Sequence, residues 1–202
     1  MKKAIILSLF ALVASAAQAQ YFDKMYFVNW AGNQPLSNTD YAGKFSARGA
    51  RLGYRELINE KFAGGIDLSW ATYDDYIGRQ TYQTGNGALT TDFFKYVESY
   101  QGTVVFDYYF FSERKLMPYV GIGLGAGYYN FKMYYNVFST SSGEWGFLTR
   151  PQAGAWLRLS ERKPWALHLS AYFDFATASS EDYEYNNFSN IGLQIGLVHL
   201  DW

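Results

Sequence analysis

The chain of 202 residues contains no cysteine, only 4 prolines and a nearly balanced formal charge of −1. The missing cysteine excludes disulfide staples, thiolate metal sites and thiol catalysis. A net charge so close to zero argues against a nucleic-acid partner. After the first segment there is also no apolar run near the roughly 20 residues that a membrane-spanning helix needs. We therefore expect neither disulfides nor a helical span in the mature protein.

Residues 1–19 have the three parts of a secretory signal peptide. Two lysines follow Met1, and residues 4–14 are an apolar run. Ala17 and Ala19 are the small residues that signal peptidase reads before a cleavage site. We expect cleavage after Ala19 and a single domain over residues 20–202. Since no cysteine follows that site, the lipoprotein route is excluded.

Aromatic residues are abundant, with 19 Tyr, 16 Phe and 6 Trp, alongside 19 Gly. A water-soluble protein has no physical reason to display so many rings. A barrel that faces lipid does, because aromatic side chains gather in girdles at both membrane interfaces. The composition therefore favours a membrane barrel.

About eight segments show the period-2 alternation of β-strands with one apolar face. The alternation is clearest near the end of the chain, where every second residue from Ile191 to Leu197 is Ile or Leu. The predicted strands are residues 21–32, 45–57, 62–73, 96–111, 118–132, 147–159, 165–176 and 187–202. Residues 74–95 and 133–146 are predicted to be loops.

Three short turns and four longer loops connect these strands, the asymmetry of a bacterial barrel with tight periplasmic turns. We therefore predict an all-β fold, an eight-stranded antiparallel transmembrane β-barrel with up-and-down topology. Both chain ends then lie on the periplasmic side, as an even number of strands requires.

A motif joins the fourth and fifth predicted strands. Residues 108–111 read Tyr-Tyr-Phe-Phe, and residues 118–127 read Pro-Tyr-Val-Gly-Ile-Gly-Leu-Gly-Ala-Gly. This arrangement resembles the small OmpA/OmpW-like outer-membrane barrel-domain families. The resemblance implies a barrel in the outer membrane, inserted by the barrel-assembly machinery, which recognises the last strand. Trp202 is then the terminal aromatic residue of that insertion signal.

The last predicted strand departs from strict alternation. Leu197 and Val198 are adjacent, so the apolar phase moves from Ile195 to Val198, Leu200 and Trp202. A β-bulge adds one residue to a strand and would reconcile the two halves. The proposed insertion signal therefore depends on a bulge near Leu197.

The second face of the predicted strands carries charged residues. Eight strands leave an interior just wide enough for side chains to fill. Charges in such a space should pair, because an uncompensated buried charge is strongly destabilising. The predicted lumenal ion pairs draw on Arg51, Asp67, Arg150, Asp174, Arg55, Asp107 and Arg158.

The short turns also predict which residues face each other across a hairpin. Pivoting the second and third strands at their turn places Arg51 opposite Asp67. Pivoting the sixth and seventh strands in the same way places Arg150 opposite Asp174. Directly opposed side chains are the units of sheet stabilisation, so these oppositions favour the inward assignment.

Two non-enzymatic functions stay open. The first is a barrel with a filled polar lumen, whose loops serve envelope structure or surface recognition, in contact with outer-membrane lipid and lipopolysaccharide. The second is a narrow OmpW-like channel for small or hydrophobic solutes, with the ion pairs as an openable gate. The glycines at 121, 123, 125 and 127 fit both functions. They can make room for other side chains in a filled lumen, or they can leave a void in a channel. A soluble lipocalin-like barrel, with its aromatic residues inside, is the structural rival.

An enzyme is the third alternative. His168 and Ser170 have the His-x-Ser spacing that resembles the outer-membrane lipid A deacylase, with imidazole and hydroxyl on one face of a strand. His168 is, however, predicted to face inward, opposite Trp156 and near the periplasmic rim, whereas lipid A lies in the outer leaflet. We therefore expect a polar interior histidine, no catalytic residue and no cofactor.

The predicted loops are acidic. Hard cations prefer clusters of carboxylates, so Ca²⁺ or Mg²⁺ bridging lipopolysaccharide phosphates is one interpretation. No fixed ligand spacing is present, so we expect solvated acidic loops and no metal site. We also expect the protein to be a monomer. The acidic residues concerned are Asp74, Asp75, Glu181, Asp182 and Glu184.

Overall fold

The computed structural model describes residues 23–37, 39–84, 87–111, 115–160, 163–180 and 186–201. The expected signal peptide and Trp202 lie outside these residues. Within the described part of the chain, no helix is long and apolar enough to cross a membrane.

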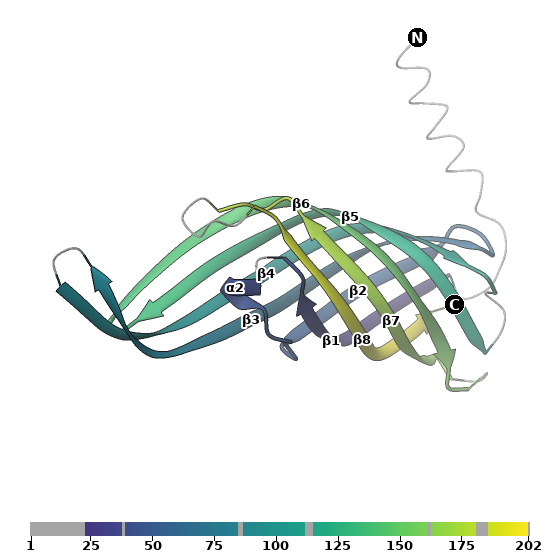
Figure 1. The fold of residues 1–202 in the computed structure, drawn as a ribbon. Helices are drawn as coiled ribbons and strands as arrows, with labels where there is room; N and C mark the ends of the chain where they lie inside the picture. Colours follow the sequence, from purple (N-terminus) through teal and green to yellow (C-terminus); the bar gives the residue numbers. More distant parts are fainter. Residues whose placement is uncertain are drawn as a thin grey trace, which may run out of the picture.

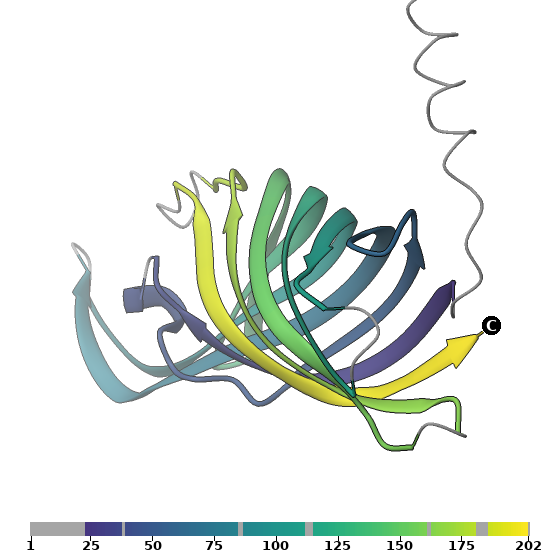
Figure 2. The same cartoon turned by 90° about the vertical axis from the view of Figure 1, so that its right-hand side faces the viewer.

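Eight antiparallel strands pair in chain order, and β8 pairs with β1 to close a barrel (Figures 1 and 2). The strands are β1 (Lys24–Pro35), β2 (Gly49–Leu57), β3 (Phe62–Thr84), β4 (Gly87–Tyr109), β5 (Leu116–Tyr135), β6 (Phe138–Arg158), β7 (Trp165–Ala176) and β8 (Phe188–Asp201). A single-turn helix, α2 (Thr39–Ala42), lies between β1 and β2. The predicted fold class is confirmed.

Side chains alternate between the outside of the barrel and its lumen, as the period of a β-strand requires. Phe106 and Leu124 lie outside and are 54% and 40% exposed, whereas Asp67 and Arg150 lie inside and are 1% exposed. The apolar face therefore points outward and the charged face inward, as predicted. A soluble barrel would place these two faces the other way round.

Four strands run further than predicted, and Figure 1 shows them extending together past the rest of the barrel. The prediction that residues 74–95 and 133–146 are loops is wrong, because residues 74–84 and 87–95 continue β3 and β4, and residues 133–135 and 138–146 continue β5 and β6, as paired strands. Polar and aromatic residues occur on both faces of these extensions, so no apolar alternation marks them. Cross-strand contacts stabilise the pairing instead, such as Tyr76 against Phe94, with ring centroids 4.6 Å apart.

β8 alternates without interruption. Its pairing with β1 keeps one register from Asn190 to Asp201, so no bulge near Leu197 reconciles the two halves of the strand. Leu197 faces outward, whereas Val198 and Leu200 are buried inside the barrel. The apolar phase shifts because the lumen itself becomes apolar at this end.

The lumen has three layers. A polar layer in the middle separates two apolar clusters, one near the turns and one near the loops. The turn-side cluster consists of Met25, Phe27, Ala63, Tyr109, Met117, Tyr119, Trp156, Ala166, Val198 and Leu200. The loop-side cluster consists of Tyr41, Ala42, Ala71, Tyr73, Val97, Tyr129, Phe131, Leu148, Ala176, Ala178 and Phe188. Each mouth of the barrel is thus packed with apolar side chains.

The inward glycines of β5 make room for these side chains. A Cβ on Gly121 would lie 1.8 Å from Asp107 Oδ1, and a Cβ on Gly127 would lie 2.7 Å from the Tyr129 ring. Both positions are filled by neighbours, so these two glycines accommodate side chains and do not leave a void.

We expect Gly121→Val to destabilise the barrel strongly. Its side chain needs the space of the Asp107 carboxylate, and displacing that group breaks the ion pair with Arg55. Breaking a buried pair costs about 3–5 kcal/mol. The measurement is the midpoint of urea unfolding of the folded protein in detergent.

Gly102→Val is the matched control. Gly102 lies on the outer face of β4, where a Cβ meets Leu68 at an ordinary 3.6 Å. Equal midpoints for the two variants would contradict the assignment of Gly121 to a filled lumen.

Candidate functional site

The polar layer is built around three arginines and three aspartates, each 1% exposed. They are Arg51, Arg55, Arg150, Asp67, Asp107 and Asp174. Six ionised groups in so little solvent can persist only when every charge has a partner. Their signs balance, and the structure pairs all of them.

The larger ionic group lies on β2, β3 and β4. Asp67 accepts hydrogen bonds from Arg51 and from Arg55, whose Nη1 lies 2.5 Å from Asp67 Oδ1. Arg55 also donates through Nε to Asp107 Oδ2, at 2.5 Å. Arg55 therefore bridges two aspartates, which ties three neighbouring strands together inside the barrel.

The smaller ionic group joins β6 and β7. Arg150 donates to both oxygens of Asp174, a bidentate pair whose second contact, from Nη2, is 2.7 Å long. Asn190 of β8 also donates to Asp174, at 3.3 Å. Bidentate arginine–carboxylate pairs are among the strongest hydrogen-bonded contacts in proteins.

A glutamine extends each of these groups. Arg51 Nη2 donates to Gln152 Oε1 at 2.8 Å, and Gln152 Nε2 donates to Asp107 at 2.9 Å. Gln101 Oε1 accepts from Arg150, while its amide nitrogen donates to the hydroxyl of Tyr129 at 2.9 Å. The two hydrogen-bonded groups meet at the Tyr172 ring, whose centre lies 5.4 Å from Cζ of Arg51 and 5.1 Å from Cζ of Arg150.

The register of the second hairpin differs from the prediction. Arg51 lies opposite Ser69, and Asp67 lies opposite Gly53, so the predicted direct opposition of Arg51 and Asp67 is wrong. The two side chains still meet diagonally, because Gly53 leaves the space that the Asp67 carboxylate occupies: a Cβ there would be 2.4 Å from Asp67 Oδ1. Counting residues outward from a turn predicts which residues of a hairpin face each other only to within a residue or two.

Arg158 is the last residue of β6 and lies on the turn side of Trp156. Its cross-strand neighbour Ala166 belongs to the turn-side cluster. The ion pairs described above join the other six predicted residues, and the pairing of Arg158 with a lumenal acid stays a prediction.

His168 lies where the polar layer meets the turn-side cluster. Its Nδ1 is 2.8 Å from Asn29 Nδ2, and its Nε2 is 2.7 Å from the hydroxyl of Tyr119. Its ring stacks on Trp156 with centroids 4.1 Å apart and planes 8° apart. The structure thus places His168 opposite Trp156, at the predicted register.

This environment does not support a His–Ser pair. Both ring nitrogens of His168 are engaged by Asn29 and Tyr119. Ser170 Oγ accepts a hydrogen bond from Gln194 at 2.5 Å. A His-activated serine needs the imidazole nitrogen directed at the hydroxyl, in a place that substrate can reach. Here His168 and Ser170 are 1% and 3% exposed.

The helix α2 closes the loop end of the lumen. Tyr41 packs against Phe131 of the loop-side cluster, and its hydroxyl donates to the backbone oxygen of Lys132 at 2.9 Å. Lys95 lies over the Tyr41 ring and donates to the backbone oxygen of Asp40. Sequence reasoning missed this helix, because four residues are too few to show a helical period.

The outer surface carries an apolar belt between two aromatic rows. On the loop side, Trp70, Tyr100, Tyr128 and Trp145 are successive cross-strand neighbours on β3 to β6. The turn-side row runs over β2, β1, β8 and β7 as Tyr54, Tyr26, His199 and Trp165. Aliphatic residues that include Val28, Leu52, Leu68, Val104, Leu124, Leu193 and Ile195 lie exposed between them.

Charged residues at the loop end of the barrel form ion pairs with one another. Asp75 lies 2.6 Å from Lys44, and Asp74 lies 3.5 Å from Arg48. Lys132 donates to Glu98 at 2.7 Å, a hydrogen bond that raises the pKa of Lys132. Glu181, Asp182 and Glu184 lie outside the described residues. Within that described part, no three acidic or histidine side chains gather as metal ligands.

A closed antiparallel barrel of eight strands, apolar outside and charged inside, has the fold of the small outer-membrane β-barrels. The chain is similar to Neisserial surface protein A, with 15% identity, a TM-score of 0.53, and coverage of 88% of this chain and 96% of that chain. Ail, the attachment invasion locus protein of Yersinia pestis, is 13% identical over 87% of this chain and 96% of its own, with a TM-score of 0.47.

The outer membrane protein OprG from Pseudomonas aeruginosa is 11% identical over 88% of this chain and 95% of its own, with a TM-score of 0.47. No family model and no curated protein matches the chain. At this identity, the likeness to Neisserial surface protein A shows the fold alone, and at that level the resemblance to outer-membrane barrel domains is confirmed.

We expect Asp67→Asn to destabilise the folded barrel by about 3–5 kcal/mol, because it leaves the charges of Arg51 and Arg55 without their shared partner. Asp74→Asn is the control on the same strand. Asp74 is 45% exposed, and surface pairs of its kind contribute about 0–1 kcal/mol. Urea unfolding in detergent, followed by tryptophan fluorescence, measures both variants. A loss for Asp67→Asn no larger than for Asp74→Asn would contradict an ionic network that stabilises the fold.

Proposed function

We propose that this chain is an integral outer-membrane β-barrel protein without enzymatic activity. Its lumen is closed, and the part that stands outside the cell serves envelope structure or surface recognition. The apolar belt between two aromatic rows carries the proposal. A surface that exposes Leu124, Leu193, Ile195 and many other apolar residues around the barrel is unfavourable in water and favourable in hydrocarbon.

The orientation follows from the lengths of the connections. The short turns after β2, β4 and β6 end at the turn-side aromatic row, so we assign that row to the periplasmic interface. The extended parts of β3 to β6 then stand outside the cell. Their exposed aromatic side chains, among them Tyr76, Phe94 and Tyr134, suit a recognition surface.

The three-layered lumen favours a closed barrel over a channel. A solute that entered from either end would have to displace an apolar cluster before it reached the polar layer. In that layer, Arg55 and Arg150 hold their aspartates through several hydrogen bonds each. Opening a path would expose several buried charges at once, which is a large energetic barrier.

The enclosure of His168 also favours a non-enzymatic protein. A lipid A-modifying hydrolase needs its catalytic groups at the lipid-facing surface near the outer leaflet. His168 instead lies inside, on the turn side of the polar layer, with both nitrogens bonded.

The membrane assignment can be tested with one pair of variants. Leu124→Arg places a charge at the middle of the belt, which costs about 2–4 kcal/mol when that surface faces the bilayer midplane. In water, the same change on an exposed side chain would be nearly neutral. We expect Leu124→Arg to reduce folding into lipid vesicles, measured as the fraction with heat-modifiable gel migration.

Phe94→Arg is the control, because Phe94 is 42% exposed against 40% for Leu124 but lies on the extended strands outside the belt. We expect it to fold into vesicles as the unchanged protein does. Equal folding of both variants would argue against a membrane-spanning belt.

The closed lumen predicts the absence of ion conduction. The unchanged protein should give no stepwise current in a planar lipid bilayer, because apolar clusters pack both mouths. Insertion is verified in parallel by heat-modifiable migration of the same preparation. Reproducible single-channel steps from inserted protein would favour the OmpW-like channel instead.

A further inference from the structure

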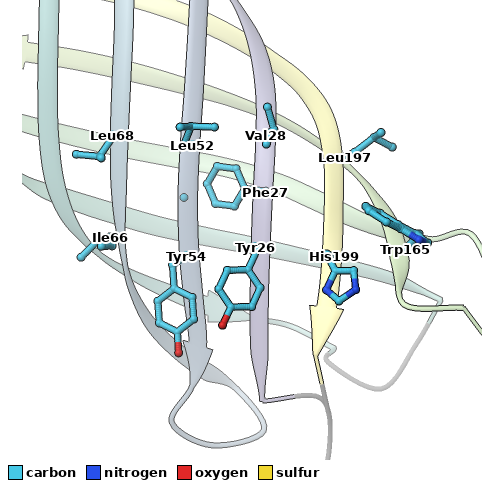
Figure 3. Close-up of a pocket in the computed structure, with 11 residues that line it drawn as sticks. Tyr26, Phe27, Val28, Leu52, Tyr54, Ile66, Leu68, Trp165, Leu197 and His199 are labelled. Carbon is cyan, nitrogen blue, oxygen red and sulfur yellow. The ribbon is translucent and has the colours of Figure 1, made fainter.

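The outer surface is hollowed across β7, β8, β1, β2 and β3, near the turn end of the barrel (Figure 3). The hollow has a volume of about 520 Å³, within the roughly 300–1,000 Å³ of sites that bind small molecules. Its upper part is aliphatic, with Val28, Leu52 and Leu197 exposed on neighbouring strands. This part of the hollow suits hydrocarbon and offers nothing to a polar solute.

The lower part of the hollow belongs to the turn-side aromatic row. Figure 3 shows the rings of Tyr54 and Tyr26 side by side, with their hydroxyls directed toward the turn end, and His199 and Trp165 beyond them. Tyr26 pairs across the strands with both Tyr54 and His199. Rings with one polar end are suited to the boundary between hydrocarbon and headgroups.

One step further toward the turns, the same face becomes charged. Lys24 is the cross-strand neighbour of Glu56 on one side and of Asp201 on the other, and all three are exposed. None of the ion pairs among the described residues involves Lys24. The Glu56 carboxylate accepts a hydrogen bond from the Tyr54 hydroxyl at 2.8 Å, which holds it at the rim of the hollow.

A cation flanked by acids, below an aliphatic hollow, is complementary to a lipid whose headgroup carries both a phosphate and an amine. Lys24 and the Tyr26 hydroxyl can donate to phosphate oxygens, and Glu56 can accept from an ammonium group. An anionic headgroup without an amine would meet repulsion from the carboxylates. A quaternary amine would have no N–H to donate to Glu56.

We propose that this hollow binds one phospholipid of the periplasmic leaflet, and that the headgroup it selects is phosphoethanolamine. One acyl chain lies against Val28, Leu52 and Leu197, the phosphate lies at Lys24, and the primary ammonium lies at Glu56. The inference rests on the proposed membrane function, because only a lipid-facing surface presents the hollow to an acyl chain.

Native mass spectrometry of the full folded chain in detergent tests the proposal. The probes are phosphatidylethanolamine, phosphatidylcholine and phosphatidylglycerol with identical acyl chains, added together in equal amounts. We expect phosphatidylethanolamine to be retained about fivefold over the other two, the upper range for a partly exposed ion pair. Glu56→Gln should reduce that preference to near one.

Filling the hollow separates a site from general lipid adhesion. Leu52→Trp adds bulk within the hollow and should abolish the retained lipid. Ile122→Trp is the matched control, since Ile122 is 45% exposed against 51% for Leu52 but lies on β5, outside the hollow. We expect the control to retain lipid as the unchanged chain does.

Equal retention of the three lipids, or equal retention by the two tryptophan variants, would overturn the proposal. So would a preference for phosphatidylglycerol, because it would show that Lys24 acts without Glu56. Folding into vesicles, read by heat-modifiable migration, is measured on the same samples. Protein that folds into vesicles but shows no headgroup preference refutes the lipid site alone, whereas protein that does not fold into them refutes the membrane function as well.

Discussion

Closure of the sheet is the constraint on which the rest of this molecule depends. When β8 pairs with β1, every strand has one face toward a narrow lumen and one face toward the surroundings. Alternate residues must then suit two opposite environments. The outer face can be apolar throughout, whereas the inner face has to fill a small space and neutralise its own charges. The aromatic rows, the ion pairs and the inward glycines all follow from this division.

The lumen shows how the inner face meets both demands. Arg55 reaches two aspartates, and Gln152 connects Arg51 to Asp107, so that no charge of the polar layer stands alone. Trp156 and Phe131 belong to the clusters on either side, and these clusters separate the charges from both mouths. A lumen filled in this way supports the proposal of a closed barrel, in which recognition would fall to the outer surfaces.

Part of this organisation could be predicted because it is local. Alternation in β8 marks a strand, and the same alternation assigns Leu197 to the outside and Gln194 to the inside without knowledge of any partner. The extensions of β3 and β4 could not be found in this way. Tyr76 and Phe94 contact each other across strands, and neither is part of an alternation of apolar and polar residues along its own strand. The adjacent apolar residues Leu197 and Val198 suggested a bulge for a related reason: the interpretation of the sequence treated the whole lumen as polar.

The sequence by itself determined the number of strands in the barrel, the direction of each face and the presence of charges inside, because these depend on a two-residue period and on turn lengths. Only the tertiary structure decided the geometry of the pairs that the sequence predicted, and the further partners of each charge. Arg51 pairs with Asp67 diagonally because Gly53, which lies opposite Asp67, has no side chain. Arg150 donates a hydrogen bond to Gln101 across the lumen. The hollow beside Tyr26 and Tyr54 likewise combines β1, β2, β3, β7 and β8, so it exists only once the barrel has closed. Contacts between strands far apart in the chain depend on register and stagger, which no single strand encodes.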